Sequence, residues 1–385
     1  MEKKSYRIII SGGGTGGHIF PALSIADAIR SKQPDAQILF VGADNRMEMQ
    51  RVPEAGYRIL GLPIAGFDRK HLWRNLKVLW LIMKSQRMAK KIIKDFKPQV
   101  AVGVGGYASG PTLKMAAKMN IPTLIQEQNS YAGVTNKILS RKAKIICVAY
   151  DGMERFFPYE KIKITGNPVR SSLLAMQNNR DDAMKAMKLD SSKRCVLIVG
   201  GSLGARSMNE SVLANLNLIE ANPDIQFVWQ TGKYYFEEMK NRIEKSGKPQ
   251  NIIITDFVSD MANALNAADL VVSRAGAGSI SEFALLGKPV ILVPSPNVSE
   301  DHQTKNAMAL VNKGAAIHIP DIKAKEELLP TTIAIVNDDN KLKTLSENIR
   351  DLAKPNAAQV IAEEVLILAD AYIEKEIRLK NENIK

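Results

Sequence analysis

Short apolar runs recur along the chain, and most are followed by a longer stretch with helical spacing. This alternation predicts strands that alternate with helices, an arrangement typical of parallel sheets covered by helices. The pattern restarts after the Gly-Asn-Pro-Val segment at 166–169, so we expect two α/β domains. The strands expected in the first domain are 6–10, 38–41, 100–104, 123–126 and 145–148, and those in the second are 195–199, 226–230, 252–255, 270–273, 290–293 and 316–319.

Chain length agrees with this division, because 385 residues exceed the size of one usual core and about 100–200 residues form a domain. A last helical pattern runs from Ala357 to about Glu374. The charged residues after it are expected to remain disordered, since they offer little apolar surface to bury.

Charge narrows the class of partner. The chain has 53 Lys and Arg against 40 Asp and Glu, a net charge of +13 at pH 7, which favours nucleic acid, anionic lipid or a phosphorylated substrate. The cations do not interleave with a recognisable nucleic-acid module, so we do not expect nucleic-acid binding.

The cysteines and the N-terminus indicate the compartment. Cys147 and Cys195 lie in apolar runs without metal-ligand spacing, which predicts reduced core residues. The first apolar run is too short for a secretory signal, so we expect a cytoplasmic protein.

Three glycine-rich turns, at 12–18, 103–111 and 200–206, each follow an apolar run directly. A turn that passes from a strand into a helix leaves backbone N–H groups free to hold phosphate, and the helix dipole adds favourable potential. The turns therefore predict a protein that binds phosphorylated ligands.

The first turn does not fit the common nucleotide-binding motifs. Its glycines match a dinucleotide pattern, but the second predicted strand runs into Gly42 and Ala43, where an acidic residue would be needed for ribose. His18 and Ile19 stand where a P-loop requires Lys and Ser or Thr. A nicotinamide enzyme and an ordinary ATPase or kinase are thereby disfavoured.

A set of motifs points to one family. In chain order they are Gly-Gly-Thr-Gly-Gly-His-Ile-Phe-Pro-Ala at 13–22, Gly-Gly-Tyr-Ala-Ser-Gly-Pro at 105–111, Glu-Gln-Asn at 127–129, Gly-Asn-Pro-Val-Arg at 166–170, Gly-Gly-Ser-Leu-Gly-Ala-Arg at 200–206 and Ser-Arg-Ala-Gly-Ala at 273–277. This combination resembles the MurG transferases of glycosyltransferase family 28. The resemblance implies a GT-B fold, in which two Rossmann-like domains face a cleft. It implies an acceptor domain at 1–166, completed by a C-terminal helix at 351–385, and a donor domain at 167–350.

The resemblance also implies a reaction: inverting transfer of GlcNAc from UDP-GlcNAc to the MurNAc 4-hydroxyl of undecaprenyl-pyrophosphoryl-MurNAc-pentapeptide (lipid I), which gives lipid II in peptidoglycan biosynthesis. No cofactor or metal ion is expected, since no Asp-x-Asp motif ends a predicted strand of the donor half. A UDP-GlcNAc 2-epimerase of the same fold is the alternative, and it would consume donor without a lipid acceptor. The resemblance implies a peripheral protein on the cytoplasmic face of the cell membrane. Cell-wall synthesis or division proteins are candidate partners.

Residue roles follow from the same resemblance. Ser202 would contact phosphate, the backbone of Val258 would read uracil, Glu282 would bind ribose hydroxyls and Gln303 the donor sugar; the alternative for Glu282 is a solvated helix carboxylate. The full set implied for UDP-GlcNAc is Thr15, Gly16, Gly17, Asn129, Arg170, Ser202, Val258, Ala277, Gly278, Ser279, Ile280, Ser281, Glu282 and Gln303, and the acceptor-side set is Gly105, Gly106, Tyr107 and Ser109.

His18 is the candidate general base, because an imidazole changes charge near neutral pH. The alternative is a helix-start residue that only bonds the loop. Glu127 is a weaker candidate for the same role.

The segment 71–96 has an apolar stripe at helical spacing, flanked by cations. Such a helix suits an anionic membrane surface, and its longest charge-free segment, 78–83, is far below the ~20 residues that span a bilayer. The alternative is a helix buried against the first sheet. The residues predicted to contact the membrane are Leu72, Trp73, Leu76, Leu79, Trp80, Lys77 and Lys84.

Overall fold

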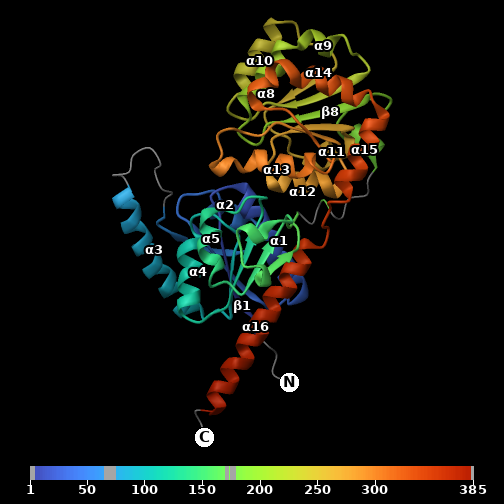
Figure 1. The fold of residues 1–385 in the computed structure, drawn as a ribbon. Helices are drawn as coiled ribbons and strands as arrows, with labels where there is room; N and C mark the ends of the chain where they lie inside the picture. Colours follow the sequence, from blue (N-terminus) through green and yellow to red (C-terminus); the bar gives the residue numbers. More distant parts are fainter. Residues whose placement is uncertain (1–4, 65–74, 170–172, 174–178, 383–385) are drawn as a thin grey trace. The chain divides into compact units, whose positions relative to one another are not determined.

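The computed structural model describes residues 5–64, 75–169, 173 and 179–382. The chain forms two compact units (Figure 1). The first unit comprises Met1–Arg170 and Lys354–Lys385, and the second comprises Ser171–Ala353. Each unit contains one parallel sheet with helices packed on it, as the alternating pattern predicts.

The first unit has a seven-stranded sheet in the order β3-β2-β1-β4-β5-β6-β7. Its strands are β1 (Arg7–Ser11), β2 (Gln37–Ala43), β3 (Arg58–Leu62), β4 (Val100–Gly103), β5 (Thr123–Glu127), β6 (Ile145–Val148) and β7 (Ile162–Ile164). Its helices are α1 (Gly16–Lys32), α2 (Glu48–Glu54), α3 (Asn75–Phe96), α4 (Ser109–Lys118), α5 (Val134–Ser140) and α16 (Ala357–Glu382). The strand order reverses between β1 and β4, and ligands of open α/β sheets bind outside the carboxyl ends of strands at such a point.

The second unit has a six-stranded sheet in the order β10-β9-β8-β11-β12-β13, which reverses between β8 and β11. Its strands are β8 (Arg194–Val199), β9 (Ile225–Gln230), β10 (Ile252–Thr255), β11 (Leu270–Ser273), β12 (Val290–Leu292) and β13 (Ile317–His318). Its helices are α7 (Arg180–Ala186), α8 (Arg206–Ala214), α9 (Leu216–Glu220), α10 (Phe236–Lys245), α11 (Met261–Ala267), α12 (Ala277–Leu286), α13 (His302–Val311), α14 (Ala324–Val336) and α15 (Asp339–Arg350).

All eleven predicted strands are present, and two further strands, β3 and β7, were not predicted. Both lie at the edges of the first sheet. A central parallel strand is buried on both faces and shows as a continuous apolar run, whereas an edge strand does not. β7 has only three residues, Ile-Lys-Ile, and β3 contains Gly61, so neither has a recognisable strand pattern.

The prediction of a disordered tail is wrong, because α16 continues to Glu382. The residues after Glu374 are mostly good helix formers and include no glycine or proline, so they extend a helix that has already begun. Its first half packs on α1, burying Ile361 and Val365 in the same core as Ile25 and Ile29. The C-terminal segment thus completes the first unit, and Figure 1 shows α16 lying along this unit.

Both cysteines are free and buried, as predicted. Burial raises the pKa of each thiol to about 12, so neither is a reactive thiolate. Within the described part of the chain, no helix has the length and apolar character needed to cross a bilayer.

Candidate functional site

The first two glycine turns meet at the carboxyl ends of β1 and β4. Gly13 and Gly14 have φ of 145° and 89°, and Gly105 and Gly106 have φ of 91° and 82°. A Cβ on Gly106 would lie 2.3 Å from the carbonyl oxygen of Gly13, so the two backbones touch with no room for a side chain. Only glycine combines this conformation with this approach.

His18 lies where these turns meet. Its Nδ1 is 3.2 Å from the hydroxyl of Thr15. Its ring packs on Gly105, where a Cβ would lie 2.7 Å from Cδ2 and 2.8 Å from Nε2. The imidazole is half-buried and is held from two sides, which restricts the orientation of the ring.

The start of α1 offers anion-binding groups beside this histidine. Thr15 precedes the helix in an extended conformation without a side-chain cap, and the first turn of the helix contains no acidic residue. Among the described residues, the backbone N–H groups of Thr15, Gly16 and Gly17 donate no hydrogen bond. A phosphate group placed here would meet these N–H groups and the positive end of the helix dipole.

Glu127, the weaker candidate base, is the last residue of β5 and is 2 % exposed. Its carboxylate accepts hydrogen bonds from the backbone N–H groups of Asn129 (3.1 Å) and Gly133 (3.0 Å), and from the side-chain amides of Asn129 (3.3 Å) and Asn136 (2.8 Å). We therefore assign it to holding the 127–136 loop. Asn129, also predicted to be a site residue, is half-buried and positioned by this carboxylate.

An amide network joins this loop to the 166–169 motif. Asn167 accepts from Gln126 Nε2 at 3.0 Å and donates through Nδ2 to the carbonyl of Gln128 at 3.0 Å. Gln128 Nε2 in turn donates to the carbonyl of Val104 at 2.7 Å, at the second glycine turn. Motifs far apart in sequence are thereby held together. Arg170, the last residue of this motif, lies outside the described residues.

The residues after β4 that are predicted to face the acceptor divide into two kinds. Tyr107 is exposed, and its ring is accessible to a ligand. Ser109 is buried, and its hydroxyl donates to the carbonyl of Gly106 at 2.9 Å, so it stabilises the turn from within.

The third glycine turn, after β8 in the second unit, is shaped in the same way as the first two. A Cβ on Gly204 would lie 2.0 Å from the carbonyl oxygen of Thr231, so the turn packs on the segment after β9. Gln230 Nε2 donates to the carbonyl of Gly201 at 3.0 Å. Ser202, which is predicted to contact phosphate, is exposed on this turn.

The other predicted donor residues of the second unit follow the carboxyl ends of its strands. Val258 follows β10 and is buried; the segment Ala277, Gly278, Ser279, Ile280, Ser281 and Glu282 starts α12 after β11; and Gln303 is on α13 after β12. Gly276, before α12, is extended and provides no side-chain cap. Gln303 Oε1 accepts the backbone N–H of Ser295 at 2.8 Å, and its Nε2 has no partner among the described residues. These residues share one edge of the sheet.

Sequence reasoning assigned no role to two residues of these edges. Arg274 donates to the carbonyls of Val293 (3.0 Å) and Pro294 (3.1 Å) and pairs with Asp321, which fixes the loops after β11 and β12. The Ser-Arg-Ala-Gly-Ala motif that contains Arg274 was the sequence signal that could have indicated this role. Glu48, on α2, has its carboxylate against the first glycine turn, and no local pattern indicates this.

Comparisons with known proteins agree with this geometry. Residues 8–148 match the glycosyltransferase family 28 N-terminal domain, and residues 195–365 match the glycosyltransferase family 28 C-terminal domain. The chain belongs to glycosyltransferase family 28. The predicted family and the predicted fold class, two Rossmann-like parallel α/β domains, are thereby confirmed.

Curated relatives match over nearly the whole chain. A Bacteroides fragilis protein is 63% identical over 363 residues, 94% of this chain and 96% of its own length. A Porphyromonas gingivalis protein is 55% identical over 360 residues, covering 93% and 94%. Both are named UDP-N-acetylglucosamine--N-acetylmuramyl-(pentapeptide) pyrophosphoryl-undecaprenol N-acetylglucosamine transferase.

Among solved structures, MurG of Acinetobacter baumannii has a TM-score of 0.74 at 28% identity, covering 94% of this chain and 99% of its own. A putative UDP-N-acetylglucosamine 2-epimerase from Listeria monocytogenes has a TM-score of 0.70 at 12% identity, covering 93% and 95%. The second likeness shows a common fold alone.

In this family 28 chain, α3 packs one face on the first unit and exposes the other. Val78, Ala89 and Ile93 are buried, whereas Leu79, Trp80 and Met83 are about half exposed. The alternative, a helix buried against the first sheet, is therefore correct for the face that carries Ala89 and Ile93 and wrong for Leu79. Lys84 Nζ lies 5.3 Å from the centre of the Trp80 ring. Leu72 and Trp73 lie outside the described residues, and the side chains of Leu76 and Lys77 are not described.

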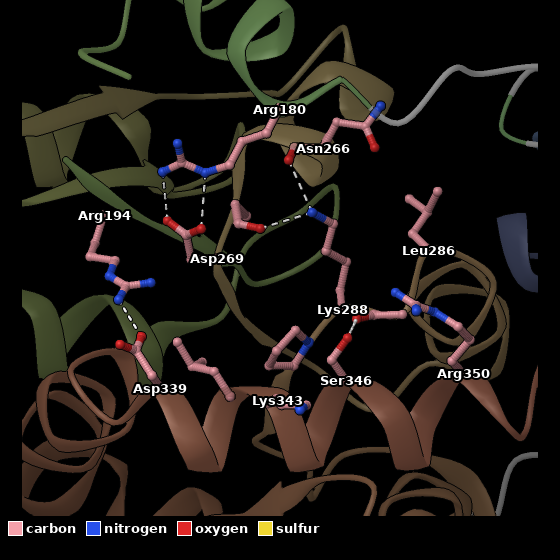
Figure 2. Close-up of a pocket in the computed structure, with 14 residues that line it drawn as sticks. Arg180, Arg194, Asn266, Asp269, Leu286, Lys288, Asp339, Lys343, Ser346 and Arg350 are labelled. Carbon is pink, nitrogen blue, oxygen red and sulfur yellow. Dashed lines mark hydrogen bonds and ion pairs between the residues drawn. The ribbon is translucent and has the colours of Figure 1, made fainter. Parts of the chain in front are cut away.

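A cavity of ≈ 390 Å³ in the second unit lies away from the predicted site residues (Figure 2). It is at the amino ends of β8, β11 and β12, the edge opposite the third glycine turn. Arg180 pairs with Asp269 and Arg194 with Asp339, while Lys288 Nζ donates to the carbonyls of Asn266 (3.0 Å) and Ala268 (2.9 Å).

The lysine of this cavity has a structural explanation. Its two carbonyl partners are at the carboxyl end of α11, where a cation is stabilised by the helix dipole. Burial nevertheless lowers the pKa of Lys288 to about 8. No group of three metal-ligating side chains occurs in the part of the chain that the structure describes.

Proposed function

We propose that this chain transfers N-acetylglucosamine from UDP-GlcNAc to the MurNAc 4-hydroxyl of lipid I, forming lipid II. The observation that carries this proposal is the 63% identity, over 94% of the chain, to proteins named for that transfer. The two glycine-turn edges support it, because each presents backbone N–H groups and a helix start to a diphosphate, as a lipid diphosphate and a nucleotide diphosphate both require.

In the proposed reaction, the acceptor 4-hydroxyl oxygen attacks the anomeric carbon of GlcNAc. The bond from that carbon to the UDP oxygen breaks, and the configuration inverts. His18 takes the hydroxyl proton, held by Thr15 and Gly105. The start of α12 and the 200–206 turn stabilise the charge on the departing UDP. Since these are backbone dipoles, the proposal requires no metal ion or cofactor.

The roles proposed within the second unit follow from the same edge. Ser202 contacts phosphate, the backbone of Val258 reads uracil, Glu282 binds the ribose and Nε2 of Gln303 donates to the sugar. An epimerase of this fold is not favoured by any specific observation, since the epimerase likenesses are at 12–14% identity.

We further propose that the protein acts on the cytoplasmic face of the membrane, as a peripheral enzyme. The exposed Leu79, Trp80 and Met83 of α3, beside Lys84, support this placement. Aromatic and apolar side chains enter the lipid headgroup region while nearby cations meet anionic lipid. This contact would bring the enzyme to a lipid-linked acceptor.

The test is transfer of radiolabelled GlcNAc to a short-chain lipid I analogue, in EDTA, with a reaction lacking acceptor as control. We expect an acceptor-dependent β-linked disaccharide. Donor consumption without acceptor would indicate the epimerase instead. His18→Ala is expected to lower kcat by about 10²–10⁴-fold while UDP-GlcNAc affinity changes little, and near-normal turnover would exclude His18 as the base.

A further inference from the structure

Glu48 places a buried carboxylate inside the first glycine turn. It is the first residue of α2 and is 1 % exposed. Oε2 accepts the backbone N–H of Gly14 at 2.8 Å, and Oε1 accepts the backbone N–H of Ala43 at 3.0 Å. The side chain thus bridges the turn after β1 and the end of β2.

No cation balances this carboxylate within the part of the chain that the structure describes. Among the described residues, no Lys, Arg or His forms an ion pair with Glu48. Removing a carboxylate from water is unfavourable, and the two N–H donors offset part of that cost. An apolar side chain would fill the same space without the cost, so packing alone does not explain an acid here.

Two glycines make room for the carboxylate. A Cβ on Gly13 would lie 2.2 Å from Glu48 Oε1, and one on Gly42 would lie 2.6 Å from its Cγ. Gly13 also touches the second glycine turn through Gly106, and His18 packs on Gly105 of that same turn. The carboxylate is therefore linked to His18 through two touching turns: Glu48 contacts the first turn, and the ring of His18 packs on the second.

The position of Glu48 also determines where an external anion can bind. The N–H of Gly14 is already used by an internal anion, and a phosphate beside it would be repelled by the like charge. The N–H groups of Thr15, Gly16 and Gly17 donate no hydrogen bond among the described residues and remain for a ligand.

We propose that Glu48 is a positioning residue that holds the first glycine turn, and with it His18, in the reactive geometry and directs a diphosphate-bearing ligand to the start of α1. The catalytic part of this inference rests on the proposed transferase function. The anion-binding part does not, because it concerns a turn that is formed in the free protein.

The test compares Glu48→Gln and Glu48→Ala with Glu54→Gln as a matched control. Glu54 is on the same helix, but its carboxylate is exposed and pairs with Arg51 at 2.8 Å. Glu48→Gln replaces one carboxylate oxygen with an NH₂ group, which would then face a backbone N–H donor without a hydrogen bond. We expect kcat to fall at least about tenfold, because small shifts of a catalytic group are costly, with the KM for UDP-GlcNAc within twofold of wild type. Glu54→Gln should leave both unchanged.

Two readouts separate this role from a general loss of structure. Inorganic pyrophosphate, titrated calorimetrically into the protein without substrates, should bind Glu48→Gln severalfold more tightly than wild type, since the repulsion is removed. Sodium formate should restore activity to Glu48→Ala, because formate can accept both N–H groups, and should not restore Glu48→Gln, whose side chain still fills the site.

Each outcome decides the inference. Unchanged kcat in Glu48→Gln, or pyrophosphate binding that is equal or weaker at an unchanged melting temperature, would overturn it. If Glu48→Ala does not fold, Glu48→Gln and the pyrophosphate titration suffice. If the wild-type protein transfers no GlcNAc, the proposed function fails, and the pyrophosphate titration still decides whether Glu48 excludes an anion from Gly14.

Discussion

The imidazole of His18 packs directly on the Cα of Gly105, so closely that a methyl group at Gly105 would lie 2.7 Å from the ring. The two residues belong to different glycine turns, after β1 and β4. The second turn therefore limits how closely the imidazole can approach, and the absence of a side chain at Gly105 allows the ring to pack against the backbone.

Gly105→Ala is expected to displace that ring. The new methyl group would move His18 by up to about 1 Å, and a displacement of that size can cost roughly 10²-fold in turnover. A Cβ at φ +91° also costs about 1–2 kcal/mol of stability. Steady-state kinetics should show a large fall in kcat at a nearly unchanged KM for UDP-GlcNAc.

Gly56→Ala is the matched control for that variant. Gly56 has φ +79°, but a Cβ there would have no neighbour within 4 Å. It should lose a similar amount of stability and keep its kcat. Equal kcat values for the two alanine variants would show that contact with Gly105 does not position His18.

Glu127→Gln tests whether that carboxylate is structural. Its four hydrogen bonds all come from N–H donors, and an amide nitrogen would oppose two of them. We expect a loss of about 1–3 kcal/mol in the free energy of unfolding, measured by denaturant titration. The pH at which kcat is half-maximal should stay the same. A shift in that pH would indicate that Glu127 is the general base.

Trp80→Glu tests the membrane surface of α3. Trp80 is 53% exposed, and the substitution replaces an aromatic ring with a charge that anionic lipid repels. Sedimentation with phosphatidylglycerol vesicles should show binding at least about fivefold weaker, from the ~1 kcal/mol that one charge contributes at such a surface. Ile322→Glu is the control, because Ile322 is 92% exposed on the second unit. Equal losses in both variants would contradict a specific role for α3.

Lys288 makes stability depend on pH in the alkaline range. Its pKa is about 8 in the folded protein against an ordinary 10.5, so between these values the unfolded chain binds more protons. The free energy of unfolding of wild type, relative to Lys288→Met, should therefore rise as pH increases from 8 to 10.5. Groups common to both proteins cancel in this difference. A flat or falling difference would show that the ammonium is not desolvated.

Local patterns alone were sufficient for the central strands and for the turns that end them. Apolar runs such as β8 and β11 are buried on both faces, so each carries its own signal. Such a signal is missing in the edge strands β3 and β7, which are defined by their pairing with β2 and β6. It is also missing in the last turns of α16, which continue a helix that packs on α1.

The sequence by itself determined the family, the α/β class and which turns present backbone N–H groups, because glycine spacing and apolar runs are properties of neighbouring residues. Only the tertiary structure decided how the site is held. Glu48 contacts Gly14 across 34 positions, Gly105 contacts His18 from the turn after another strand, and Glu127 accepts hydrogen bonds from its own loop. Such contacts depend on which strands lie side by side, and no local pattern encodes that.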